Sequence, residues 1–260
     1  MTQKLVITGR RRLALAIGLP LALACVGWTG LNFVSLAAQA KYKLAPTVLP
    51  NGSALRLSLS NGDVAVAPSA DGRAHVEGTV NYSLVNARVS WRLVAGAVVL
   101  SGPSCFWLGN CGSDLHLAVP SDEALRASLG SGTLIVEDLK GRLRLSIDSG
   151  DIKVRRVSGP MALADSSGNI AGAALTSSTV TASDDSGDIS LTFSRAPTKV
   201  EGRDSSGNIT VAVPANVAYR VIARVSSGSS HVDVPTDPAS KRVIDLSDDS
   251  GDIDVIPAAP

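Results

Sequence analysis

Apolar and polar residues alternate in short segments through the second half of the chain. The segments DIKV (151–154), DISL (188–191), NITV (208–211) and DIDV (252–255) each place an apolar side chain at every second position. Alternation with a period of two predicts half-buried β-strands. Gly, Ser, Thr and Asp are dense in this region and no 3.6-residue period is present, so the pattern favours strands over helices.

A Ser-Gly turn precedes these strands and recurs every 18 to 23 residues. Asp and Ser side chains can bond the backbone two residues on, and Gly tolerates positive φ, so each phrase predicts a tight turn that leads into a strand. Recurrence at about 20 residues is typical of a repeat architecture. The structural turn glycines are Gly132, Gly150, Gly168, Gly187, Gly207, Gly228 and Gly251.

Each repeat also contains a second alternating segment, such as PMALADS (160–166) or STVTASD (178–184). A coil of about 20 residues cannot bury its apolar face alone, so neighbouring coils must stack. We therefore predict an all-β protein, with a β-solenoid or β-roll over residues 121–256. One stacked core ladder is expected to contain Ile152, Ile170, Ile189, Ile209 and Ile253, and the next Val154, Leu191, Val211 and Val255.

Residues 51–120 are predicted to form an N-terminal β region that covers the end of the stack. The segment LRLSLSNGDVAVAP (55–68) is a degenerate earlier copy of the repeat, whereas the strands expected over 73–119 are less regular. Such a cap would protect the open strand edge of the solenoid. Residues 257–260 are expected to be a short tail.

The N-terminus carries a predicted membrane segment. Residues 13–38 form an uncharged run of 26 residues, which as a helix would be about 39 Å long and could span a bilayer. Lys4 and the three arginines at 10–12 precede it, so the positive-inside rule places a basic tail (1–12) in the cytoplasm and the β domain outside. Residues 39–50 are then expected to be a linker.

Two other interpretations of this segment stay open. Ala38-Gln39-Ala40 has the form of a cleavage site, so the segment could be a removed signal sequence. Attachment of a lipid at Cys25 is the third alternative. All three place the β domain outside the cytoplasm.

Acidic and neutral residues alternate between successive turns. Directly after the turn glycine stand Asp151, Asn169, Asp188 and Asn208 in four consecutive copies. Because stacked coils lie about 4.8 Å apart, carboxylates in register would repel, and alternation would double their separation. We interpret the pattern as electrostatic relief. Calcium binding by the aspartate turns is the alternative, although a calcium-binding repeat has half this period.

Two cysteines are disulfide candidates. Cys105 and Cys111 bracket the segment FWLGN, and an oxidising compartment favours a bridge that would fix this loop. Two free thiols, or a zinc site that includes His116, are the alternatives. Phe106 and Trp107 in this loop could instead form an apolar contact tip.

Charge and motifs exclude several classes of function. Six of the 24 basic residues precede Arg56 whereas all 23 acidic residues follow it, so the body has a net charge of about −5 and no footprint of a nucleic-acid binder. No nucleophile elbow, zincin motif or phosphate-binding loop is present. We therefore expect no enzyme activity, no cofactor and no metal.

The SGDI and SGNI turns, the preceding Val-Pro strands and the apolar N-terminal segment resemble the bacterial putative-adhesin family of β-strand-repeat domains of unknown function. The resemblance covers residues 51–256 and is strongest over 117–256. It implies an extracytoplasmic β-solenoid. Some members of the family are associated with envelope-stress systems, and no functional residues carry over.

Together these observations predict a single-pass membrane protein whose β domain is a non-enzymatic cell-surface structural or adhesin-like module. Its partner would be a cell-wall polymer or a surface protein. The alternative is an accessory or regulatory component of an envelope-stress or signalling system. A polysaccharide-acting β-helix enzyme is a third possibility, which glycan turnover would reveal.

Overall fold

The computed structural model describes residues 39–50, 54–83, 88–102 and 111–259. The predicted membrane segment 13–38 therefore lies outside the described residues, and no described helix is long and apolar enough to cross a membrane. Within the described residues every regular element is a strand, which confirms the all-β prediction. The strands are β1 (Gln39–Val48), β2 (Ala54–Leu59), β3 (Gly62–Pro68), β4 (His75–Ser83), β5 (Ser90–Val94), β6 (Ala97–Ser101), β7 (Cys111–Val119), β8 (Leu125–Glu137), β9 (Leu143–Arg155), β10 (Met161–Asp165), β11 (Gly168–Leu175), β12 (Thr179–Ser183), β13 (Ile189–Phe193), β14 (Lys199–Asp204), β15 (Ile209–Val213), β16 (Arg220–Ser227), β17 (Ser230–Val232), β18 (Val243–Ser250) and β19 (Ile253–Pro257).

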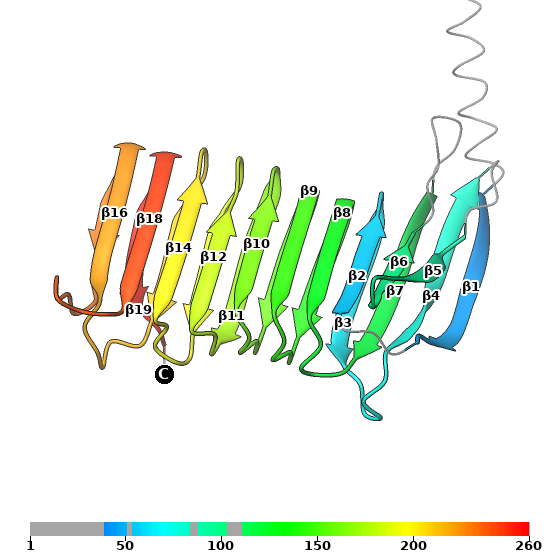
Figure 1. Cartoon of the computed structure of the whole chain (residues 1–260). Coiled ribbons are helices and arrows are strands. Elements are labelled where there is room, and N and C mark those ends of the chain that lie inside the picture. The colour runs from blue at the N-terminus through cyan, green and yellow to red at the C-terminus, as the bar shows by residue number, and fades with distance from the viewer. Residues whose placement is uncertain (1–38, 51–53, 84–87, 103–110, 260) are drawn as a thin grey trace, which may run out of the picture.

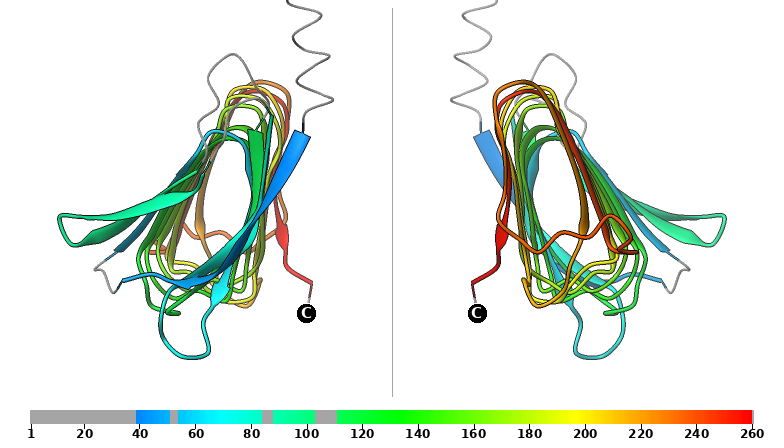
Figure 2. Two further views of the ribbon diagram at one scale, coloured as in Figure 1. Left: turned by 90° about the vertical axis from the view of Figure 1, so that its right-hand side faces the viewer. Right: turned by 90° about the vertical axis from the view of Figure 1, so that its left-hand side faces the viewer.

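The strands form a flattened solenoid with two facing layers (Figures 1 and 2). The first layer follows the order β5-β6-β2-β8-β9-β10-β12-β14-β18-β16. The second follows the order β1-β4-β7-β3-β8-β9-β11-β13-β15-β19-β17. The long strands β8 and β9 pass from one layer into the other, so each coil supplies one segment to each layer.

The predicted isoleucines lie directly above one another in the second layer. Parallel pairing joins Ile152 to Ile170, Ile170 to Ile189, Ile189 to Ile209 and Ile209 to Ile253, and all five side chains are fully buried. Burial of each such side chain contributes about 1.5–3 kcal/mol. In the second ladder Gly172 stands between Val154 and Leu191, where a Cβ would press on the Leu191 side chain.

The turn glycines form a column along one edge of the stack, and the stacking itself requires glycine. Gly187 has φ +150°, and a Cβ placed there would collide with the backbone carbonyl of Gly168 in the coil below. A Cβ at Gly150 would collide in the same way with the carbonyl of Gly132, and a Cβ at Gly132 with the carbonyl of Gly62. Positive φ and this close approach both disfavour any residue with a side chain. The repeated phrase therefore encodes the contact between coils.

The order of the coils in space differs from their order in the sequence at the C-terminal end. Strand β18 pairs with β14 on one side and with β16 on the other, and β19 lies likewise between β15 and β17. The last coil of the chain, formed by β18 and β19, therefore lies between the coil of β14 and β15 and the coil of β16 and β17. Gly251 stands on Gly207, and Gly228 stands on Gly251.

The N-terminal end of the stack is built differently from the sequence expectation. The prediction of a linker over residues 39–50 is wrong for most of this segment. Its residues form β1, which pairs antiparallel with β4, with Gln39 opposite Ser83. Strands β2 and β3 belong to the solenoid, since both pair in parallel with β8. The antiparallel pairs β1–β4, β4–β7 and β5–β6 lie beyond this first coil (Figure 1).

Replacement of Gly187 by Ala should destabilise the solenoid strongly, because the new methyl group meets backbone rather than a flexible side chain. Gly72→Ala is the comparison variant: nothing lies within 4 Å of its added Cβ, and its positive φ (+69°) lies in the left-handed region, which is less costly for alanine than the φ of Gly187. Urea unfolding should show that Gly187→Ala loses at least about 2 kcal/mol more than Gly72→Ala. Equal losses would contradict the requirement for glycine at position 187.

Candidate functional site

Side chains directly after the turn glycines form a hydrogen-bonded ladder along the turn edge of the stack. The Asn208 Nδ2 donates to Asp188 Oδ1 at 3.1 Å, and the Asn208 Oδ1 accepts the backbone N–H of Asp252 at 3.1 Å. Asn169 repeats this arrangement, with its Nδ2 3.2 Å from Asp151 Oδ1. Each asparagine side-chain amide therefore donates a hydrogen bond to the aspartate side chain of one neighbouring coil and accepts a hydrogen bond from the aspartate backbone N–H of the other.

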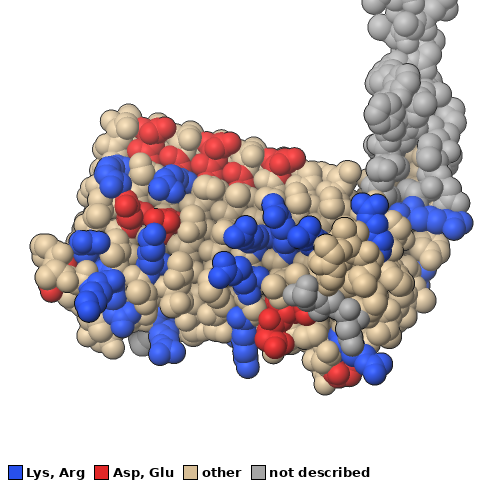
Figure 3. Space-filling view, in the orientation of Figure 1, with Lys and Arg blue, Asp and Glu red and all other residues tan. Residues whose placement is uncertain are grey.

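Acidic and neutral residues alternate along this ladder in the spatial order of the coils. In the sequence the alternation breaks where Ser229 follows Asn208, but insertion of the last coil places Asp252 between them. Figure 3 shows acidic side chains in separate patches along this edge. From β3 to β17 the residues are Asp63, Thr133, Asp151, Asn169, Asp188, Asn208, Asp252 and Ser229. The alternation ends at β3, because Asp114 of the neighbouring strand β7 is in register with Asp63.

These contacts stabilise the carboxylate forms. Hydrogen bonds from Lys153 and then Asn169 lower the pKa of Asp151, and hydrogen bonds from Ser229 lower the pKa of Asp252. Among the described residues, no three His, Cys, Asp or Glu side chains come together as a candidate metal site. The neutral neighbours therefore satisfy the carboxylates directly, by hydrogen bonds as well as by the wider spacing of charge.

A second column of acids lies inside the same turns, three residues before the glycine, and it does not alternate. Its members occupy four adjacent coils, and each is at most 5% exposed. In each carboxyl group Oδ1 accepts a backbone N–H of the turn, whereas Oδ2 is buried without a hydrogen-bond partner. This aspartate column consists of Asp165, Asp184, Asp204 and Asp248.

Burial without compensation raises the pKa of every member of the aspartate column. Desolvation is the largest cause at all four sites, and it raises the pKa of Asp204 to about 6. Asp184 and Asp248, on the coils either side of Asp204, raise that pKa further through charge repulsion. The column therefore favours uptake of protons in the folded state.

Arginines on three adjacent coils form a row on the exposed face of the first layer. Arg56 of β2 pairs in register with Arg126 of β8, which pairs with Arg144 of β9. All three side chains are exposed, and Arg142 lies beside them at the start of β9. Figure 3 shows basic side chains gathered over the middle of this layer. We call Arg56, Arg126 and Arg144 the arginine row.

The arginine row has no acidic counterpart within the described part of the chain. None of its side chains takes part in an ion pair or hydrogen bond there. On the coils that follow β9, the residues in register with Arg144 are Ala162 of β10, Thr181 of β12, Glu201 of β14 and Asp245 of β18. The two acids are paired, because Glu201 contacts Lys199 at 2.8 Å and Asp245 contacts Arg224 at 2.7 Å.

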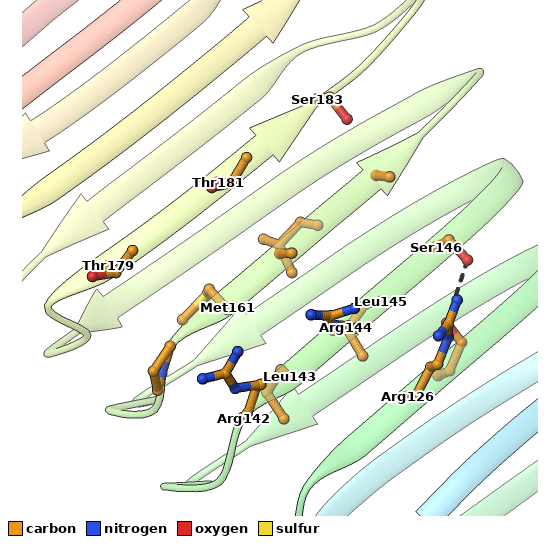
Figure 4. Close-up of a pocket in the computed structure, with 15 residues that line it drawn as sticks. Arg126, Arg142, Leu143, Arg144, Leu145, Ser146, Met161, Thr179, Thr181 and Ser183 are labelled. Carbon is orange, nitrogen blue, oxygen red and sulfur yellow. Dashed lines mark hydrogen bonds between the residues drawn. The ribbon is translucent and has the colours of Figure 1, made fainter.

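A hollow of about 430 Å³ adjoins the arginine row (Figure 4). Long side chains of Arg126, Arg142 and Arg144 line one side of it. Beyond them the lining includes the short side chains Ala162, Ala164, Thr179, Thr181 and Ser183 of β10 and β12, together with the larger apolar residues Met161 and Leu163. The hollow exists because Arg144 is followed on the next coils by Ala162 and Thr181. We call the arginine row, Arg142 and this hollow the arginine face.

Sequence reasoning did not identify the arginine face, although a signal for it was present. The segments LRLSL (55–59), LRASL (125–129) and LRLSI (143–147) share Arg and Ser at equivalent positions. The repeat places these arginines in one row. The apolar alternation of these segments is explained by strand formation alone, so the shared arginine was not considered separately.

Other candidate residues lie apart from the arginine face. Cys111 begins β7 and is disulfide-bonded, but Cys105 lies outside the described residues, so their pairing stays a prediction. Phe106 and Trp107 also lie outside them. His116 is exposed on β7, 3.6 Å from Asp114 and not in a cluster of metal-ligating side chains.

A family model described as Toastrack DUF4097 matches residues 110–256, more than half of the chain, and the chain belongs to this family. Among solved structures, a putative adhesin from Bacteroides fragilis is 13% identical with a TM-score of 0.44, covering 84% of this chain and 96% of that one. A putative cell adhesion protein from Clostridium sporogenes is 12% identical with a TM-score of 0.38, covering 83% and 99%. No curated protein matches the chain.

Asn208→Asp should destabilise the turn edge most at low salt. The change inserts a carboxylate between Asp188 and Asp252 and removes the amide donor. We expect the Tm to fall by about 2–4 °C more at low than at high salt, since salt screens repulsion between exposed charges. Asn208→Ser, which adds no charge, should show a smaller and salt-independent loss. A salt-independent effect of Asn208→Asp would contradict electrostatic relief.

The aspartate column should make the protein more stable in mild acid. The folded-state pKa of Asp204 lies above its ordinary value of 3.8, so its contribution is present at low pH and is lost as the pH rises through about 6. The Tm should therefore rise as the pH falls from about 6 to about 4, and Asp204→Asn should flatten this rise. The exposed neighbour Asp185→Asn should retain it. An unchanged profile in Asp204→Asn would contradict a contribution of Asp204 to the rise.

Proposed function

We propose that this Toastrack family chain is a membrane-anchored, extracytoplasmic and non-enzymatic interaction module that binds a cell-surface polymer or protein through the arginine face. One observation carries the proposal: three exposed arginines stand on adjacent coils without acidic partners, beside a hollow of short side chains. Like charges directly opposite one another destabilise a sheet. A partner that supplies negative charge would offset this cost.

The solenoid suits such a role because it holds the side chains of its face on a rigid framework. The arginine row is held by parallel pairing of β2, β8 and β9, whose inward side chains are buried in the core. Sites on strands are positioned more accurately than sites on loops. The face is therefore organised before a partner arrives, which lowers the entropy cost of binding.

A second candidate function is coupling to a membrane sensor in an envelope-stress or signalling system. The observation that favours it is the position of β1, which begins at Gln39, directly after the predicted span 13–38. No flexible linker would then separate the anchor from the β domain. Movement of the anchor would be transmitted to the solenoid through the pairing of β1 with β4.

Recovery of partners from intact envelope would distinguish the two functions. Full-length protein and residues 39–260 should be compared, with β1 kept whole in both. Retention of a wall polymer or surface protein by residues 39–260, and loss of it in Arg126→Gln/Arg144→Gln, would support the interaction module. Recovery of a membrane sensor by full-length protein alone would support the second function and exclude the first.

A further inference from the structure

We propose that the arginine face binds a linear anionic polysaccharide, with acidic groups of the polymer on the arginine row and sugar rings in the adjoining hollow. This inference rests on the proposed interaction function and specifies its ligand. Three observations support it: the charge of the row, the chemistry of the hollow and the direction in which both extend.

The charge of the row is not neutralised by any acid among the described residues. Several cationic side chains on the described surface contact acids, as where Arg156 Nε lies 2.7 Å from Asp138 Oδ1, whereas the arginine row contacts none. Glu201 and Asp245, which lie in register with the arginine row on other coils, each form an ion pair with a cationic side chain. The three arginines form no ion pair with an acid of the described chain. Guanidinium groups bind carboxylates and phosphates through two parallel hydrogen bonds.

The hollow supplies a different kind of contact. Thr179, Thr181 and Ser183 offer hydroxyl groups that donate and accept hydrogen bonds, and Ala162 and Ala164 offer small apolar surfaces. Sugar hydroxyls and the C–H faces of sugar rings match this mixture. Met161 and Leu163 also line the hollow, but the lining contains no aromatic side chain of the kind that commonly anchors a protein partner.

The direction of the site favours a polymer over a small anion. Arg56, Arg126 and Arg144 follow the axis of the stack in steps of about 4.8 Å, and the hollow continues along that axis over β10 and β12. A chain lying along the axis would contact all three cations and then the hollow. A single phosphate or carboxylate would neutralise only part of the row.

The test uses full-length protein in a neutral detergent and four probes. Polygalacturonate is a linear polysaccharide with carboxylates, polyphosphate is a linear anion without sugar, dextran is a neutral polysaccharide, and vesicles of phosphatidylglycerol represent a lipid surface. We expect polygalacturonate to bind more tightly than polyphosphate, with an affinity that falls as salt rises. Dextran should not bind measurably.

Variants locate the site. Arg126→Gln/Arg144→Gln should weaken polygalacturonate binding at least tenfold, whereas the control Arg203→Gln/Arg220→Gln, which removes the same charge from exposed positions on β14 and β16, should change it less than threefold. Thr181→Leu should fill the hollow and weaken polygalacturonate without weakening polyphosphate. Equal losses in both double variants would overturn the site, since binding would then follow net charge alone.

Other outcomes separate this inference from the proposed function. Polyphosphate or vesicles bound as tightly as polygalacturonate, or more tightly, would overturn the polysaccharide as ligand. Failure of polygalacturonate to bind, while Arg126→Gln/Arg144→Gln still abolishes recovery of an envelope partner, would overturn only the ligand class. Failure of polygalacturonate together with undiminished recovery by that variant would overturn both the ligand and the proposed function.

Discussion

Contact between turn glycines of successive coils is the constraint on which the rest of the structure depends. A Cβ at Gly187 or Gly150 would collide with the carbonyl of the glycine on the adjacent coil, so at this turn position the coils reach strand-pairing distance only when the residue is glycine. This contact fixes the register of both layers at once. Once it is fixed, every other position of the repeat must also stack on its equivalent, whether apolar, acidic or basic.

In-register stacking turns single charges into rows of like charge, and the protein offsets the repulsion in two of these rows. At the turn edge, neutral residues such as Asn208 separate the carboxylates and hydrogen-bond to both neighbours. In the aspartate column no neutral residue intervenes, and burial raises the pKa of Asp204 to about 6, so this column takes up protons in mild acid. The arginine row can use neither solution, because guanidinium groups do not lose their protons at physiological pH. We propose that its charge is neutralised by a partner.

Much of the solenoid could be predicted from the sequence because its repeats are short and their chemistry is local. Turn glycines and the isoleucine ladder follow directly from the phrase and its period. The order of the last two coils could not be predicted in the same way, since Ser229 and Asp252 follow equivalent turns and either coil could stack on Asn208. The break in the acidic alternation at Ser229 was the available signal. Strand β1 was missed because Lys41, Lys43 and Pro46 interrupt its pattern, and its pairing with β4 is a tertiary contact.

Cysteine cross-linking tests the stacking order, on which the alternation of charge depends, most directly. Adjacent coils place equivalent Cα atoms about 4.8 Å apart, within reach of a disulfide, whereas coils two steps apart lie near 10 Å, beyond it. The account predicts that full-length Asn208→Cys/Asp252→Cys forms this bridge under mild oxidation, identified by peptide mapping against the native cysteines. Asn208→Cys/Ser229→Cys should not form one. A bridge in the second variant and none in the first would show that the coils stack in sequence order and would contradict the account.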